Sequence, residues 1–65
     1  MSDLIQKALH KAGYDSNPTE ANLIECFLDY VAGGIYSNLT SEEAVDMIND
    51  GEITVKQMCV ALIRF

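Results

Sequence analysis

Carboxylate side chains are the residues of this sequence best placed to bind a cation. Asp46 and Asp50 stand four residues apart, and Gly51 follows at once. Thr54 lies four residues beyond Asp50, so three oxygen-bearing side chains recur around a glycine that favours a sharp turn. Oxygen atoms supplied by such a loop are the ligands that calcium takes in proteins. Asp46 and Asp50 are therefore the candidate metal ligands of the chain.

Residues 46–57 resemble the calcium-binding loop of an EF-hand. Asp at the first and fifth positions and Gly at the sixth agree with that pattern, whereas Ile48 and Gln57 replace ligands at the third and twelfth. The resemblance implies at most a degenerate calcium site. A helix stop at Asp50-Gly51 and a helix start at Thr54 explain the same residues without a metal. We expect no cofactor and keep a degenerate EF-hand-like module as a third hypothesis.

No group of residues has the spacing of a catalytic site. His10 is the single histidine, and it is expected on the polar side of a helix with Lys7 and Lys11. Cys26 and Cys59 are far apart and lack the CxxC spacing of a zinc or redox site, so they are predicted to be reduced and buried. The sequence therefore predicts a protein that is not an enzyme.

Charge is distributed unevenly along the chain. The net charge is −6, all four Lys and Arg residues lie near the ends, and residues 12–55 hold nine acids and no base. Such a surplus of carboxylates argues against direct binding to nucleic acid or to an anionic membrane, because both need Lys and Arg.

The expected partner is a protein with a basic surface, which carboxylates would attract electrostatically. Simple solubility is the alternative explanation of the same charge. The expected partner-binding residues are Glu25, Asp29, Glu42, Glu43, Asp46, Asp50 and Glu52.

Two helices are predicted in the first half of the chain. The first begins near Ser2 and ends before Gly13, with apolar residues at helical spacing on one face. The second is expected from Pro18 to about Ala32, with Asn17 as its N-cap, because Pro is favoured at the first helical position.

Two further helices are predicted in the second half. Thr40 and Glu43 form a capping box that begins a helix ending near Asn49. Thr54 and Gln57 form a second box that begins the last helix. No segment alternates apolar and polar residues as a strand does. We predict an all-α fold, a compact bundle of four short helices joined by tight capped turns, forming a single domain over the whole chain.

The last helix is apolar on almost every side. Lys56, Gln57 and Arg64 are its only polar residues, so the helix must be buried in its own domain or in a partner. A homodimer is therefore a second hypothesis, and a tightly filled monomer core is its alternative. The expected oligomer interface consists of Tyr36, Met58, Leu62 and Phe65.

The leading functional hypothesis is a small acidic regulator or inhibitor that occupies the basic, nucleic-acid-binding surface of a partner protein. Its size and charge are typical of phage and mobile-element proteins. A DNA-reading helix-turn-helix in the last two helices is disfavoured by the acidic charge and by the apolar final helix. The chain shows no apolar leader and no apolar run of about 20 residues, so we expect a cytoplasmic location.

Overall fold

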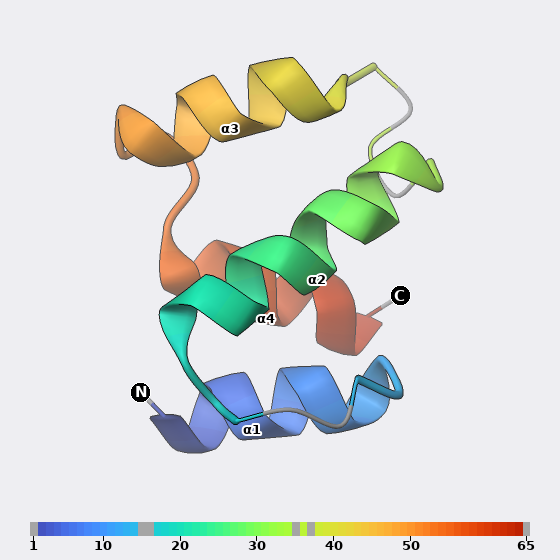
Figure 1. The fold of residues 1–65 in the computed structure, drawn as a ribbon, viewed down its shortest axis with the longest axis vertical. Coiled ribbons are helices and arrows are strands. Elements are labelled where there is room, and N and C mark those ends of the chain that lie inside the picture. The colour runs from blue at the N-terminus through green and yellow to red at the C-terminus, as the bar shows by residue number, and fades with distance from the viewer. Residues whose placement is uncertain (1, 15–16, 35, 37, 65) are drawn as a thin grey trace.

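Four helices make up most of the chain that the structure describes, which comprises residues 2–14, 17–34, 36 and 38–64. In this computed structural model they are α1 (Ser2–Lys11), α2 (Glu20–Ala32), α3 (Ser41–Asn49) and α4 (Val55–Arg64) (Figure 1). The described residues contain no strand, so the prediction of an all-α bundle of four short helices is confirmed. None of these helices has the length and apolarity needed to cross a membrane.

Helix α2 connects two unequal parts of the molecule. On one side, α1, α2 and α4 pack against one another. On the other side, α3 packs against α2, and no Cα atom of α3 comes within 8 Å of a Cα atom in α1 or α4. α3 and α1 consequently lie at opposite ends of the longest axis, with α2 and α4 between them (Figure 1).

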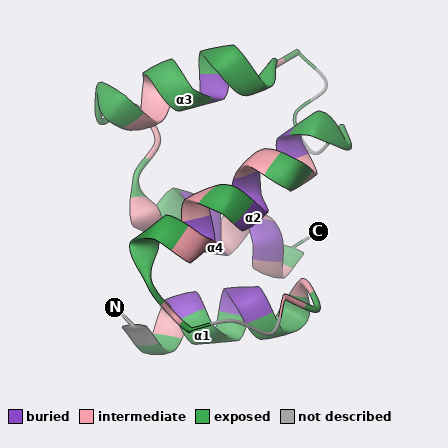
Figure 2. Cartoon of the chain, in the orientation of Figure 1, coloured by how far each residue is buried: buried purple, intermediate pink, exposed green. Residues whose placement is uncertain are grey.

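The core lies where α1, α2 and α4 meet. Phe27 and Leu23 of α2, Leu9 of α1 and Leu62 of α4 are each at most 2% exposed. Burying such a side chain contributes about 1.5–3 kcal/mol. α3 adds only Ala44 to the buried set, and the rest of its surface is exposed or half-buried (Figure 2). The stability of the fold therefore comes mainly from the three-helix part.

Both predicted capping boxes are confirmed, and the second one helps to fix the short connection between α3 and α4. The Thr40 main-chain N–H donates to Glu43 Oε1 at 3.1 Å, and the Thr54 N–H donates to Gln57 Oε1 at 2.8 Å. α3 ends at Asn49, with Asp50 as its C-cap, and the φ of 81° at Gly51 lies in the left-handed region that favours glycine. The Gly51 N–H donates to the Ile48 carbonyl, which is the expected bond of a glycine stop.

The predicted N-cap of α2 is wrong by two residues. Thr19, in an extended conformation, caps the helix, and its Oγ1 accepts from the Asn22 N–H at 3.2 Å. Asn17 contributes its main-chain carbonyl, which accepts from the Thr19 N–H and from Asn22 Nδ2. These two bonds hold residues 17–19 in a turn ahead of the helix, so Pro18 lies outside α2 and Glu20 is its first residue.

Replacing the cap tests this assignment. Thr19→Ala should lower the free energy of unfolding by about 1 kcal/mol, because the Asn22 N–H loses its acceptor. Asn17→Ala is the matched control and should cost much less, since alanine keeps the main-chain carbonyl. Urea unfolding followed by circular dichroism measures both. A larger loss from Asn17→Ala would reject Thr19 as the cap.

Candidate functional site

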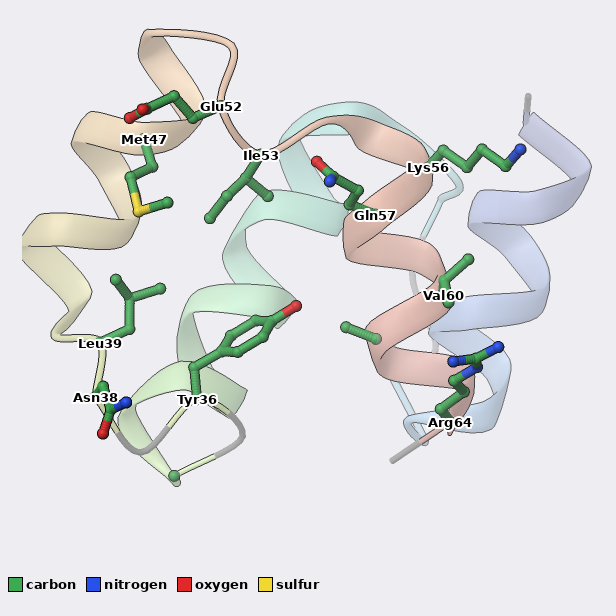
Figure 3. Close-up of a pocket in the computed structure, with 12 residues that line it drawn as sticks. Tyr36, Asn38, Leu39, Met47, Glu52, Ile53, Lys56, Gln57, Val60 and Arg64 are labelled. Carbon is green, nitrogen blue, oxygen red and sulfur yellow. The ribbon is translucent and has the colours of Figure 1, made fainter.

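An open groove with a volume of about 1060 Å³ lies between α3 and α4 (Figure 3). It exists because α3 packs on α2 alone and leaves the side of α4 that faces it uncovered. The residues that line it are Gly34, Tyr36, Asn38, Leu39, Met47, Glu52, Ile53, Lys56, Gln57, Val60, Ala61 and Arg64. Figure 3 shows that they come from α3, from α4 and from the connections on both sides of α3.

The middle of the groove is apolar and rests on the core. Leu39 and Ile53 are half-buried and pack against the buried cluster. Tyr36 is 39% exposed, yet its ring meets the ring of the buried Phe27 edge-on, with centroids 5.7 Å apart. Within the part of the chain that the structure describes, no hydrogen bond is recorded for the Tyr36 hydroxyl. This side chain is therefore anchored at its ring and has a free polar end.

The α4 wall of the groove is basic. Lys56, Val60 and Arg64 recur every four residues and so form one row along α4, beside a second row of Gln57 and Ala61. Lys56 and Arg64 are exposed, and they are the only charged residues of α4. Gln57 points toward α3 and Lys56 points away from it (Figure 3), so the two cations, with Val60 between them in sequence, stand along the outer edge of the α4 wall.

The opposite wall is acidic. Met47 and Glu52 line it directly. Glu43 and Asp50 stand four residues before and three residues after Met47, which makes them its neighbours on the surface of α3. The groove thus has an apolar floor between walls of opposite charge.

The structure brings together only part of the predicted acidic face. Glu42, Glu43, Asp46 and Asp50 are all exposed on or at the end of α3, and we call these four residues the α3 face. Glu52 lies at the groove.

Glu25 and Asp29 belong to a different place. They lie on α2 near Tyr14, where partial burial, reinforced by the charges of Glu25 and Asp29, raises the pKa of the tyrosine. Tyr14 follows α1, at the end of the molecule remote from α3. The seven acids that the sequence grouped together therefore form two separate patches.

The basic residues are carried by two helices that pack against each other, which the sequence did not reveal. Lys7 and Lys11 are exposed on α1, and Lys56 and Arg64 are exposed on α4. Because α1 packs against α4, all four bases belong to one pair of helices, whose only acid is Asp3. Only the packing of the two ends of the chain, which no local signal encodes, could have revealed this.

The predicted oligomer interface requires correction. Met58 and Leu62 are each 1% exposed and belong to the core of the chain itself, so they offer no surface to a second copy. Packing against α1 and α2 satisfies the apolar side of α4. Tyr36 is exposed in the groove, and Phe65 lies outside the described residues.

The EF-hand-like segment does not have the form of a calcium loop. α3 continues through Asn49, so the first four positions of that segment, Asp46 included, are helical. The Gln57 side chain at its twelfth position accepts from the Thr54 N–H. Among the described residues, no three His, Cys, Asp or Glu side chains are grouped so as to hold a metal, and Asp46 and Asp50 are surface carboxylates.

Both cysteines are free and buried, as the sequence predicts. Burial raises the pKa of the Cys26 thiol, and the charge of Asp29 adds to this effect. Burial also raises the pKa of the Cys59 thiol. A raised pKa keeps a thiol protonated and therefore unreactive at neutral pH.

These thiols make stability depend on pH. Unfolding returns each pKa to about 8.5, so above that pH the unfolded chain releases protons that the folded chain retains. The free energy of unfolding should therefore be constant below about pH 8 and fall toward pH 9.5, by at most about 1.4 kcal/mol per pH unit for each thiol. Urea unfolding at several pH values measures the slope. Cys26→Ala/Cys59→Ala should flatten it, and equal slopes in both proteins would contradict the assignment.

Comparisons with known proteins assign no family to the chain. No protein-family model matches it, and neither a curated protein nor a solved structure matches it significantly.

Proposed function

We propose that the protein is a non-enzymatic binding protein, a small regulator or inhibitor that docks its α3 face on a basic surface of a protein partner. The observation that carries this proposal is the position of α3. The helix is attached through α2 alone, so Glu42, Glu43, Asp46 and Asp50 project from one end of the molecule. Neither α2 nor α3 contains a Lys or Arg that could neutralise them.

The placement of these acids is unfavourable for the isolated helix. Asp46 stands four residues from both Glu42 and Asp50, and like charges at this spacing repel by a few tenths of a kcal/mol per pair. Asp46 and Asp50 also lie toward the C-terminal end of α3, where the helix dipole favours cations. Within the described residues, no hydrogen bond or ion pair engages the carboxylates of Glu42, Asp46 or Asp50. Cations of a partner would relieve this repulsion.

A basic surface that binds nucleic acid is the class of partner that fits best. Four carboxylates on one helix face can occupy Lys and Arg side chains that otherwise contact phosphates, and this competition makes the protein an inhibitor. The two free, buried thiols support a cytoplasmic setting, where cysteines stay reduced. Head-to-tail self-association of the acidic α3 face with the basic α1–α4 pair is the second candidate.

Neutralising the α3 face should abolish this binding. The variant is Glu42→Gln/Glu43→Gln/Asp46→Asn/Asp50→Asn. Each new side chain has nearly the shape of the one it replaces, and Gln at position 43 preserves the capping box. The association rate with the partner should fall at least about tenfold at low salt, because steering by charge is lost. The partner is captured from a nuclease-treated lysate, identified by mass spectrometry and then purified for rate measurements.

The control variant removes the same charge elsewhere. Asp3→Asn/Glu20→Gln/Glu25→Gln/Asp29→Asn also changes the net charge from −6 to −2 but leaves α3 intact. This variant should still bind the partner. An equal loss of binding by both variants would show that the total charge, and not the α3 face, is responsible for binding. Capture of nothing but the protein itself, with a mass that grows with concentration in sedimentation, would favour self-association.

A further inference from the structure

We propose that the groove between α3 and α4 binds an amphipathic helix of a partner protein, with acidic residues along the edge that meets α4 and basic residues along the edge that meets α3. This inference concerns the groove, whereas the proposed function concerns the outer side of α3; Glu43 and Asp50 border both surfaces, and Glu42 and Asp46 belong to the α3 face alone. The inference rests on the lining of the groove and on the charges of its two walls.

The size and openness of the groove favour a segment of protein chain. Its volume of about 1060 Å³ is at the upper limit of the roughly 300–1,000 Å³ of small-molecule pockets. It is an open groove that lies between two helices, α3 and α4 (Figure 3). Helix-in-groove recognition uses this kind of apolar surface, into which a partner helix inserts side chains spaced three or four residues apart.

The α4 wall determines where the acidic residues of the partner must lie. Lys56 and Arg64 are eight residues apart, which corresponds to about 12 Å along the helix axis. A partner helix running beside α4 therefore places acids seven or eight residues apart on one edge. Apolar residues between them would face Val60 and Ala61.

The two walls together select a helix with different charges on its two edges. A helix with acids on both edges would meet repulsion from Glu52 and from Glu43 and Asp50 beside Met47. A helix with bases on both edges would meet repulsion from Lys56 and Arg64. Opposed walls thus exclude uniformly charged partners, which is a source of specificity.

Tyr36 has the properties of an anchoring residue. Its ring is held against Phe27, so little side-chain entropy is lost when a partner covers it. No described residue forms a hydrogen bond with its hydroxyl, which can accept or donate one across an interface. Tyrosine is also among the residues most enriched at the energetic centres of interfaces.

A second copy of the chain does not fit the same groove. The apolar residues of α1, α2 and α4 are already packed in the core of their own molecule, and the exposed side of α3 is mainly acidic. A symmetric dimer through the groove would place a concave surface on a concave surface, and antiparallel α4 helices would bring Lys56 toward Arg64 of the other copy.

Three synthetic helical peptides of equal length test the proposal at 150 mM salt. All carry the same leucine stripe, and their two edges are Glu and Lys, Glu and Glu, or Lys and Lys. Fluorescence anisotropy should show at least about tenfold tighter binding of the Glu/Lys peptide than of the other two, because only this peptide is attracted by both walls. No detectable binding of this peptide at 1 mM would overturn the proposal, as would tightest binding of the Lys/Lys peptide.

Two protein variants with equal charge locate the site. Lys56→Glu/Arg64→Glu and Lys7→Glu/Lys11→Glu both change the net charge from −6 to −10, and all four positions are exposed. The first should weaken binding of the Glu/Lys peptide about tenfold or more, and the second less than threefold. Tyr36→Ala should weaken it to a similar degree as the first. Equal weakening by the two charge variants would overturn the groove assignment.

A last variant separates the groove from the proposed function. Glu42→Gln/Asp46→Asn removes two acids of the α3 face that lie away from Met47. It should leave binding of the Glu/Lys peptide unchanged. Loss of the peptide in this variant would place binding on the α3 face and overturn the groove as the site.

Discussion

The attachment of α3 to α2 is the contact on which both surfaces of interest depend. Ala44 is the one side chain of α3 that is fully buried, and its small size lets the two helices approach closely. Because α3 is held along α2 and stays clear of α4, the groove forms beside it and four carboxylates project from its outer side. A larger contact between α3 and α4 would close the groove and neutralise part of the α3 face.

Local chemistry accounts for most of what the sequence predicted correctly. A capping box is a bond between residues three apart, so Thr40 with Glu43 and Thr54 with Gln57 could be recognised without knowledge of the fold. The start of α2 was predicted wrongly, because Asn17 followed by Pro18 has the pattern of a cap, whereas Thr19 caps the helix. In the structure the Asn22 main-chain N–H donates to Thr19 and the Asn22 side-chain amide donates to the Asn17 carbonyl, an arrangement that sequence spacing alone does not specify.

The candidate site could not be predicted in the same way, because it is made by segments that meet only after folding. Tyr36, Met47 and Val60 come from three parts of the chain, and each alone is an ordinary apolar residue. Met58 and Leu62 were, conversely, predicted to form a site and belong to the core. Hydropathy showed that they must be covered, but only the packing of α1 and α2 around α4 shows that the chain covers them itself.

Unequal anchoring of the helices gives the molecule two levels of stability. Opening of α3 would break its contact with α2 and leave the packing of Leu9, Leu23 and Leu62 in place. Amide hydrogens of α3 should therefore exchange with solvent through such partial openings, whereas those of α4 should exchange only through global unfolding. Since α3 forms one wall of the groove, its movement would also change the width of the groove. The groove could then accommodate partner helices of different diameters.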